Sequence, residues 1–388
     1  MKCILVTGAR PNFMKIAPIY KAFTAAAKNG MSAEALLVHT GQHYSPNMSD
    51  DFFHDLGIPA ADINLEVGSG SHSTQTARVM CGFETVCREH RPDWVVVVGD
   101  VNSTIACALA ASKLGIAVAH VEAGLRSFDR RMPEEINRIC TDAISDLLFT
   151  TDAIAGENLV NEGIHLDRIR FVGNTMIDSL YEHIGRARAK PLPHGVAAGQ
   201  YAVLTLHRPS NVDSAERLRP IVEAINAIAE RIPVVFPVHP RTAPGLSDLR
   251  LHRGVRTVQP MSYLPFLGLM ASSRMVLTDS GGIQEETTAL KIPCLTMRLN
   301  TERPVTCQIG TNVLVGTDPQ RIIQEAERVL EGQVREGSMP EKWDGRAGER
   351  IVAALVTERS TDVASTLPKC GAVSHAARNS AHPTSAAR

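Results

Sequence analysis

The sequence predicts an α/β protein with two doubly wound parallel-sheet domains and a central cleft between them. Short apolar runs alternate with longer amphipathic segments along most of the chain, as expected for parallel strands joined by helices. The alternation stops at a basic stretch that contains two prolines, and then it restarts. The chain has 388 residues, which is long for one ordinary core and favours two domains.

The first half of the chain is the expected N-terminal domain, residues 1–182. Its apolar runs KCILVTG, AEALLVHTG, WVVVVGD, AVAHVE and LLFTTD are the expected strands, and helical segments follow them. One helix is expected from about Thr74 to Glu89, because Val79, Phe83 and Val86 recur at helical spacing.

The stretch HIGRARAKPLPHGVAAGQ is the expected connection to a C-terminal domain of residues 183–344. Strands YAVLTLH, PVVFPVH, RMVLTD and IPCLTM follow, with helices near Arg217–Glu230 and from Ile283. A last helix at 345–358 is expected to join the first domain. Residues 360–388 lack periodicity, so a disordered tail is expected there.

Composition excludes several classes of function. The formal net charge is −1, so no overall field attracts nucleic acid or an anionic membrane. No apolar run approaches the ~18 residues of a membrane span, and MKCILVTGARP lacks the cleavage site of a signal peptide. The eight cysteines are scattered without a CxxC pair, which favours reduced thiols and no zinc site. A cytoplasmic location is therefore expected.

The stretch TDSGGIQEETTALKIPCL, residues 278–295, predicts a seat for a nucleotide diphosphate. It has the pattern of a strand end, a glycine turn and the first turns of a helix. Gly281 and Gly282 would let the backbone approach a ligand, and a helix N-terminus favours an anion. A carboxylate at Glu285 or Glu286 can bind ribose hydroxyls. The alternative is an ordinary strand, turn and helix whose acidic residues complement the helix dipole.

Chemically capable side chains follow most of the expected strands. Ligands of open α/β sheets bind outside the carboxyl ends of the strands, whereas a single polar residue there is often only a helix N-cap. A whole set suits a negatively charged ligand whose neutral end undergoes acid–base chemistry. The first domain would present carboxylates, and the second His, Arg and glycine N–H groups. The set is Arg10, Gln42, His43, Asp100 and Glu122 in the first half and His207, Arg208, His239, Arg241 and Asp279 in the second.

Two further segments add charge near these strand ends. In GARPNFMK, Arg10 offers a forked donor set for phosphate, and Lys15 is either a second anion ligand or a solvated helix residue. In SFDRRMPEEINR, Pro133 suits the first position of a helix and places Glu134 and Glu135 in its first turn. These carboxylates either complement the helix dipole or serve as general acid and base.

A set of motifs together resembles the non-hydrolysing UDP-N-acetylglucosamine 2-epimerases. They run in order from about Lys2 to Gly316: GARPNFMKIAPI, HTGQHY, VVGDVNST, HVEAGLRSFDRRMPEEINR, VGNTMID, LTLHRPSNVD, PVHPRT, LTDSGGIQEE, TERPVT and GTNVLVG. The resemblance implies the glycosyltransferase-B architecture, in which two Rossmann-like domains flank a cleft and the C-terminal domain holds most of the nucleotide. It also implies a homodimer and a role in surface polysaccharide synthesis.

The activity implied by this family is the interconversion of UDP-N-acetylglucosamine and UDP-N-acetylmannosamine. The proton on sugar carbon 2 is not activated by a carbonyl, so its direct removal is hard. Elimination of UDP across carbons 1 and 2 gives a 2-acetamidoglucal, and re-addition of UDP with protonation of the other face inverts carbon 2. This route needs a base, an acid and an anion clamp, but no NAD and no obligatory metal.

The resemblance also implies a set of site residues. The acid–base carboxylates, whose order stays open, match Asp100, Glu122 and Glu134. The phosphate-binding positions match Arg10, Lys15, Ser280, Gly281 and Gly282. His207 matches a position near the diphosphate, and Glu286 matches the residue that binds the ribose. Phe266 matches an aromatic residue that packs on uracil, and Arg303 is a further expected site residue. An alternative explanation of Phe266 is core packing.

Some bacterial members of the family carry a second UDP-sugar site that activates the enzyme. The residues that match parts of this site are Gln42, His43, Arg208 and His239. The match is incomplete, because Thr74 stands where the family pattern has an arginine.

Three alternatives to a plain N-acetylglucosamine epimerase stay open. HTGQHYSPNMSDDFF and SFDRRMPEE resemble members that act on UDP-diacetamido-glucuronic acid, whereas TERPVT and GTNVLVG resemble the plain enzymes. A UDP-sugar glycosyltransferase shares the fold but does not need three carboxylates opposite the diphosphate seat. A non-catalytic UDP-sugar sensor would not need them either.

Overall fold

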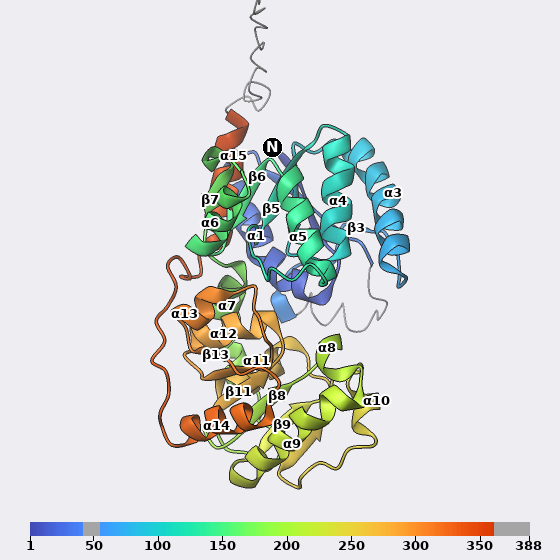
Figure 1. Cartoon of the computed structure of the whole chain (residues 1–388). Helices are drawn as coiled ribbons and strands as arrows, with labels where there is room; N and C mark the ends of the chain where they lie inside the picture. The colour runs from blue at the N-terminus through green and yellow to red at the C-terminus, as the bar shows by residue number, and fades with distance from the viewer. Residues whose placement is uncertain (42–54, 361–388) are drawn as a thin grey trace, which may run out of the picture.

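The computed structural model describes residues 1–41 and 55–360 of the 388-residue chain. They form two lobes, and the N-terminal lobe lies above the C-terminal lobe in Figure 1. Gln42, His43 and the tail expected beyond residue 360 lie outside the described residues.

The N-terminal lobe contains a parallel sheet with the strand order β3-β2-β1-β4-β5-β6-β7. Its central strands are almost entirely apolar, because helices cover both faces of a parallel sheet. The strands are β1 (Lys2–Thr7), β2 (Glu34–His39), β3 (Ile63–Asn64), β4 (Trp94–Val98), β5 (Ala117–Val121), β6 (Leu147–Thr150) and β7 (Ile169–Phe171). The helices are α1 (Arg10–Lys28), α3 (His72–His90), α4 (Asn102–Lys113), α5 (Pro133–Ile144), α6 (Ala153–Asn161) and the 3-10 helix η1 (Leu166–Arg168).

The C-terminal lobe contains a second parallel sheet, with the order β10-β9-β8-β11-β12-β13. Its strands are β8 (Ala202–Thr205), β9 (Val234–Pro237), β10 (Val255–Val258), β11 (Met275–Thr278), β12 (Cys294–Thr296) and β13 (Asn312–Leu314). Its helices are α8 (Pro209–Val212), α9 (Ala215–Arg231), α10 (Ala243–Leu246), α11 (Tyr263–Ala271), α12 (Gly281–Leu290), α13 (Pro304–Gln308) and α14 (Pro319–Leu330).

The prediction of two doubly wound parallel sheets is confirmed. Each sheet reverses its winding once, between β1 and β4 in one lobe and between β8 and β11 in the other. At such a point the loops that leave the carboxyl ends of the strands diverge and open a crevice. These four loops lead to Arg10, Asp100, His207 and Ser280. The fold therefore places these four expected site residues at its two switch points.

Helix α7 (Thr175–Arg188) passes between the lobes, and the expected boundary at residues 182/183 falls inside it. Ile177 and Leu180 of α7 belong to one core with residues of α1 and α11. Helix α15 (Ala347–Ser360) returns to the N-terminal lobe (Figure 1). It packs so closely on α1 that a Cβ on Gly348 would lie 2.7 Å from the carbonyl oxygen of Pro18.

Within the described ranges, no helix combines the length and the apolar character needed to cross a bilayer. The cysteines of this part of the chain form no disulfide with one another. The buried ones among them are Cys3, Cys87, Cys107 and Cys294.

Candidate active site

Glu122 follows β5 and has a left-handed backbone conformation, with φ of +69°. This conformation costs a non-glycine residue roughly 1–2 kcal/mol, so the surrounding chain must hold it. Two residues further on, Gly124 donates its N–H to Asp142 and accepts a hydrogen bond from Asn158. Glu122 is only 2% exposed. The strained turn thus directs a carboxylate into the protein.

Lys15, in the second turn of α1, neutralises this carboxylate. Its Nζ lies 2.6 Å from Oε2 of Glu122, and both side chains are buried. The other oxygen, Oε1, has no hydrogen-bond partner in the described part of the chain. Asn12 donates to the carbonyl of Val98 at 2.7 Å and fixes α1 against the end of β4. Glu122 therefore presents one uncommitted oxygen beside a fixed ammonium group.

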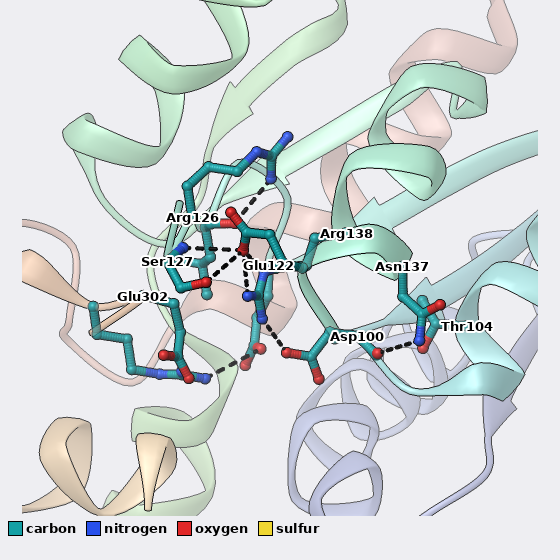
Figure 2. A network of polar contacts seen from close by, with 12 residues as sticks. Asp100, Thr104, Glu122, Arg126, Ser127, Asn137, Arg138 and Glu302 are labelled. Carbon is teal, nitrogen blue, oxygen red and sulfur yellow. Dashed lines mark hydrogen bonds and ion pairs between the residues drawn. The ribbon is translucent and has the colours of Figure 1, made fainter. Parts of the chain in front are cut away.

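Asp100 follows β4 and forms an ion pair with Arg138 of α5 (Figure 2). Asn137 donates a hydrogen bond to the Asp100 carbonyl at 2.9 Å. Burial raises the pKa of the Asp100 carboxyl, but Arg138, Lys15 and Arg303 outweigh burial and hold the pKa below its ordinary value. Asp100 is therefore ionised at neutral pH.

The two neighbouring glutamates in the first turn of α5 have different surroundings. Glu135 is buried, accepts hydrogen bonds from Ser127 and Phe128, and pairs with Arg138. Glu134 is half-buried, and its side chain makes no hydrogen bond or ion pair with any described residue. Glu135 therefore holds the loop before α5, whereas Glu134 is left available to a ligand.

Arg303, in the C-terminal lobe, contacts carboxylates of both lobes. It lies 3.0 Å from Glu285 and 2.8 Å from Glu302, and 3.8 Å from Glu122 of the N-terminal lobe. Figure 2 shows Glu302 on one side of Glu122 and Asp100 on the other side. The guanidinium group thus joins the two lobes where their strand ends meet.

Two buried carboxyl groups of α12 have raised pKa values. Burial raises the pKa of Glu285 to about 7, although Arg303 opposes the shift, and Asn174 donates to its Oε1 at 2.9 Å. Burial also raises the pKa of Glu286 to about 7, and the Tyr263 hydroxyl donates to it at 3.1 Å. Both groups thus retain their protons to a higher pH than an ordinary glutamate.

Helix α12 begins earlier than expected. Ser280 is its N-cap residue and Gly281 and Gly282 are its first helical residues, so the expected glycine turn before a helix at Ile283 is wrong. Neither glycine has a positive φ. A Cβ on Gly281 would lie 2.6 Å from Nη1 of Arg303, so packing rather than backbone geometry requires this glycine. Because Ser280 forms no side-chain cap bond, the first N–H groups of α12 can receive an anion.

Asp279, which is buried, organises the loop that follows β8. It accepts hydrogen bonds from the N–H groups of His207 and Arg208, and its Oδ1 lies 3.0 Å from Nδ1 of His207. Burial raises the pKa of Asp279, but His207 and these N–H groups outweigh burial and hold the pKa below its ordinary value. The exposed His239 ring lies 5.6 Å from the His207 ring, and Arg208 lies 3.4 Å from Glu302. Asp279 thus fixes the His207 imidazole beside the start of α12.

Comparison with known proteins identifies the family. A family model described as UDP-N-acetylglucosamine 2-epimerase matches residues 25–356. The chain belongs to this epimerase family. It is therefore an epimerase, an enzyme of the isomerase class.

Relatives match nearly the whole length of the epimerase. The UDP-N-acetylglucosamine 2-epimerase of Methanocaldococcus jannaschii is 43% identical over 368 residues, which cover 92% of this chain and 99% of that protein. The crystal structure of the M. jannaschii enzyme in complex with UDP-GlcNAc and UDP has a TM-score of 0.83 at 42% identity, over 92% of this chain and 100% of that one. The UDP-2,3-diacetamido-2,3-dideoxy-D-glucuronate 2-epimerase of Pseudomonas aeruginosa is 43% identical over 361 residues, 92% and 99% of the two chains. The expected glycosyltransferase-B architecture is confirmed by this likeness.

The epimerase brings together four of the residues expected from its sequence. Lys15, Asp100, Glu122 and Arg303 lie in one buried charge network, which Gly281 borders. Other expected residues lie apart from it or are not described. Phe266 is half-buried on α11 and packs against the core, Glu286 faces Tyr263, and the side chain of Arg10 lies outside what the structure describes.

The expected division of charge between the two rims is incomplete, because each lobe also carries groups of the opposite sign. Arg138 and Lys15 lie in the lobe that was expected to present carboxylates. Glu285 and Glu302 lie in the lobe that was expected to present cations and N–H groups. The physical reason is that a buried charge is stable only beside an opposite one, so each lobe supplies both signs.

The sequence did not identify several residues that contact and orient the expected site residues. Arg138 lies one helical turn after Glu135, and this spacing was a usable signal. Glu302 directly precedes Arg303 in TERP. The buried pair of His120 and Asp142 gave no local signal, because tertiary packing alone brings the two together.

Proposed function

We propose that this epimerase inverts carbon 2 of UDP-N-acetylglucosamine to give UDP-N-acetylmannosamine. The names of its relatives and the ligands of the M. jannaschii complex support this substrate. The observation that carries the proposal is the 3.8 Å approach of Glu122 in one lobe to Arg303 in the other. It sets a carboxylate with an uncommitted oxygen beside a cation that can receive a leaving diphosphate.

The C-terminal lobe holds UDP in this proposal. The N–H groups at the start of α12 and the Ser280 hydroxyl contact the diphosphate, and His207 lies beside it in the orientation set by Asp279. Glu286 accepts from the ribose hydroxyls, and the half-buried face of Phe266 packs on uracil. The polar groups thus orient the nucleotide while the sugar extends toward the other lobe.

The N-terminal lobe acts on carbon 2. A carboxylate removes the C2 proton while the C1–O bond breaks, so that the glucal C1=C2 bond forms and UDP leaves with the bonding electrons. UDP then adds to C1 through the same oxygen, and an acid protonates C2 from the opposite face. The candidate groups are Asp100, Glu122 and Glu134, of which Asp100 is held ionised by Arg138. Arg303 and Lys15 offset the charge on UDP while the glucal intermediate is present.

A second candidate substrate is favoured by the Pseudomonas aeruginosa relative, which is as similar to this chain as the M. jannaschii enzyme. UDP-2,3-diacetamido-2,3-dideoxy-D-glucuronate shares carbon 2, its acetamido group and the UDP leaving group. The same elimination and re-addition would therefore serve it. It differs by an acetamido group on carbon 3 and a carboxylate on carbon 5.

One experiment decides among these activities. The protein is incubated in D2O with UDP-N-acetylglucosamine alone and, separately, with the diacetamido-glucuronate. We expect deuterium at carbon 2 and formation of UDP-N-acetylmannosamine from the first substrate. Free N-acetylmannosamine would show a hydrolysing enzyme, and exchange only with the second substrate would transfer the proposal to it. No exchange with either substrate would contradict an epimerase.

The second UDP-sugar site at Arg208 and His239 stays a proposal, as does the homodimer. Arg208 lies 3.4 Å from Glu302, which contacts Arg303, so a ligand bound at Arg208 would perturb the site described above. Activation of the reverse reaction by added UDP-N-acetylglucosamine tests this. A hyperbolic curve that the added nucleotide sugar does not change would contradict it.

A further inference from the structure

His120, in β5, has oxygen acceptors at both ring nitrogens. Its Nδ1 lies 2.6 Å from Oδ1 of Asp142, and its Nε2 lies 2.8 Å from the carbonyl oxygen of Gly99. The side chain is fully buried. A backbone carbonyl can only accept a hydrogen bond, so Nε2 must carry a proton.

The surroundings of Asp142 place a second proton on the ring. Its carboxylate also accepts from the Gly124 N–H at 3.1 Å and lies 2.7 Å from Arg126. Burial raises the pKa of Asp142, but His120 and Arg126 outweigh burial and hold the pKa below its ordinary value. An ionised carboxylate has no proton to donate, so Nδ1 must be protonated as well. Turning the ring by a half-rotation would place C–H groups at both oxygens and lose both hydrogen bonds.

The carbonyl that His120 holds belongs to the peptide that carries Asp100. Gly99 also lies against the ion pair of Lys15 and Glu122. A Cβ on Gly99 would lie 2.8 Å from Nζ of Lys15 and 3.8 Å from Oε2 of Glu122. With φ of +69°, Gly99 adopts a left-handed conformation that glycine takes without strain, so backbone sterics alone do not fix this peptide. A shift of this peptide would therefore move both carboxylates.

We propose that His120 is a buried imidazolium that positions the Gly99–Asp100 peptide and, through it, the carboxylates of Asp100 and Glu122. The proposal rests on the function proposed above for these two carboxylates. His120 is a positioning residue in it, because its ring contacts the backbone and Asp142 rather than substrate.

Charge balance supports a positive ring. From His120 a chain of groups with alternating sign leads to the surface, through Asp142 and Arg126 to the partly exposed Glu162, which accepts from Arg126 at 2.6 and 2.7 Å. With an imidazolium the four charges cancel. With a neutral ring, a buried carboxylate would face a lone pair and the chain would carry a net negative charge. Among the described residues, the charged group in contact with the His120 ring is Asp142 of α5. Asp142 in turn contacts Arg126 of the loop after β5.

Selective ¹⁵N labelling of histidine measures the ring charge without any assay of activity. The chain has 14 histidines, and the His120→Gln variant identifies the His120 signals by their absence. We expect both ring nitrogens to be protonated at about pH 8, because each faces an oxygen that can only accept a hydrogen bond. An unprotonated ring nitrogen at about pH 8 would overturn the imidazolium.

Two substitutions separate the two hydrogen bonds. His120→Gln places a donor near the position of Nε2 and so retains the bond to Gly99, whereas His120→Asn retains only a donor toward Asp142. We expect kcat to fall about tenfold in the first and about a hundredfold in the second, as for misplaced catalytic groups. The KM for UDP-N-acetylglucosamine and the Kd for UDP should stay within about threefold, because UDP binds the other lobe. His165→Gln, which removes an exposed histidine 2.7 Å from Asp167, is the control.

The outcomes separate this inference from the proposed function. Equal kcat values for His120→Asn and the wild type, in a variant that still binds UDP, would overturn the positioning role. A wild type that exchanges no C2 proton would overturn the proposed function, while the ¹⁵N spectrum still determines the charge of His120. If His120→Asn does not fold, Asp142→Asn replaces it. That variant should yield a neutral His120 and a lower kcat, and an imidazolium that persists in it would count against the proposal.

Discussion

The Nζ of Lys15 lies 2.6 Å from Oε2 of Glu122, and Arg303 of the other lobe lies 3.8 Å from the same oxygen. One carboxylate oxygen therefore receives a cation from each lobe, while the second oxygen is left uncommitted. Glu122 thus receives its second cation only when the two lobes are together.

Removal of either strand-end carboxylate should stop turnover and leave UDP binding intact. Glu122→Gln and Asp100→Asn retain size and shape but lose the proton-transferring group, so we expect kcat to fall by about 100-fold or more. Kinetics and calorimetric titration with UDP measure the two effects. Glu84→Gln, which alters an exposed ion pair on α3, is the control. Near-normal turnover in Glu122→Gln would show that our role for this residue is wrong.

Loss of Lys15 should destabilise the protein as well as lower its kcat. Lys15→Met leaves the buried Glu122 with only the more distant Arg303, and removing one partner of a buried ion pair costs about 3 kcal/mol or more. Arg88→Met removes an exposed i,i+4 partner of Glu84 and should change the free energy of unfolding by about 0.5 kcal/mol or less. Urea unfolding compares the two, and equal changes would contradict the buried pair.

Glu286 should make the stability of the unliganded protein depend on pH. Its pKa is raised from 4.5 to about 7, by burial first and by Glu285 second, while Tyr263 opposes the shift. Because the folded pKa exceeds the unfolded one, the stabilisation is complete below about pH 4.5 and is lost as the pH rises through about 7. Glu286→Gln resembles the protonated form, so it should equal the wild type at about pH 4. By about pH 8 it should exceed the wild type by up to about 3 kcal/mol.

Unfolding free energies measured across this pH range test the Glu286 prediction. Glu285 titrates in the same range, so the Gln variant should retain part of the pH dependence. Parallel curves for wild type and variant would show that Glu286 does not titrate on unfolding.

Ser280 should matter for UDP and not for the helix that it begins. A lost N-cap bond commonly costs about 1 kcal/mol, but the Ser280 side chain makes no such bond. We therefore expect Ser280→Ala to melt like the wild type and to bind UDP about tenfold more weakly, as for a lost hydrogen bond to a charged group. Ser71→Ala is the matched control, because the Ser71 side chain caps α3 by accepting from Thr74. It should lose stability and retain UDP affinity, and the reverse pattern would contradict the assignment.

The sheets and strand-end residues could be predicted because both follow from local patterns. Alternating apolar runs define parallel strands, and ligands of such sheets bind at the carboxyl ends, where Asp100, Glu122, His207 and Ser280 lie. No local pattern reports the left-handed φ of Glu122, which the loop imposes from outside. The motif match identified Glu122 as a site residue, but it did not predict the strained backbone conformation of this residue.

Contacts between distant segments were the part that could not be predicted. Arg303 reaches Glu122 across 181 positions of sequence and between two lobes, so periodicity carries no trace of the pair. The start of α12 was misplaced for a related reason. Glycine is a poor helix former, which favours a turn at Gly281, but the nearby Arg303 and Glu302 side chains leave no room for a Cβ there.

The two glycines of α12 should therefore respond differently to alanine. A Cβ on Gly281 would lie 2.6 Å from Nη1 of Arg303 and 2.8 Å from Oε1 of Glu302, so the buried ion pairs must move. We expect Gly281→Ala to lose about 1–3 kcal/mol, as for other overpacked sites. A Cβ on Gly282 would meet only the flexible end of Met176 at 3.4 Å, and alanine gains helix propensity of up to about 1 kcal/mol. Gly282→Ala should be neutral or stabilising in urea unfolding of the unliganded protein. Equal stabilities for the two variants would mean that Arg303 and Glu302 have a second arrangement of equal energy.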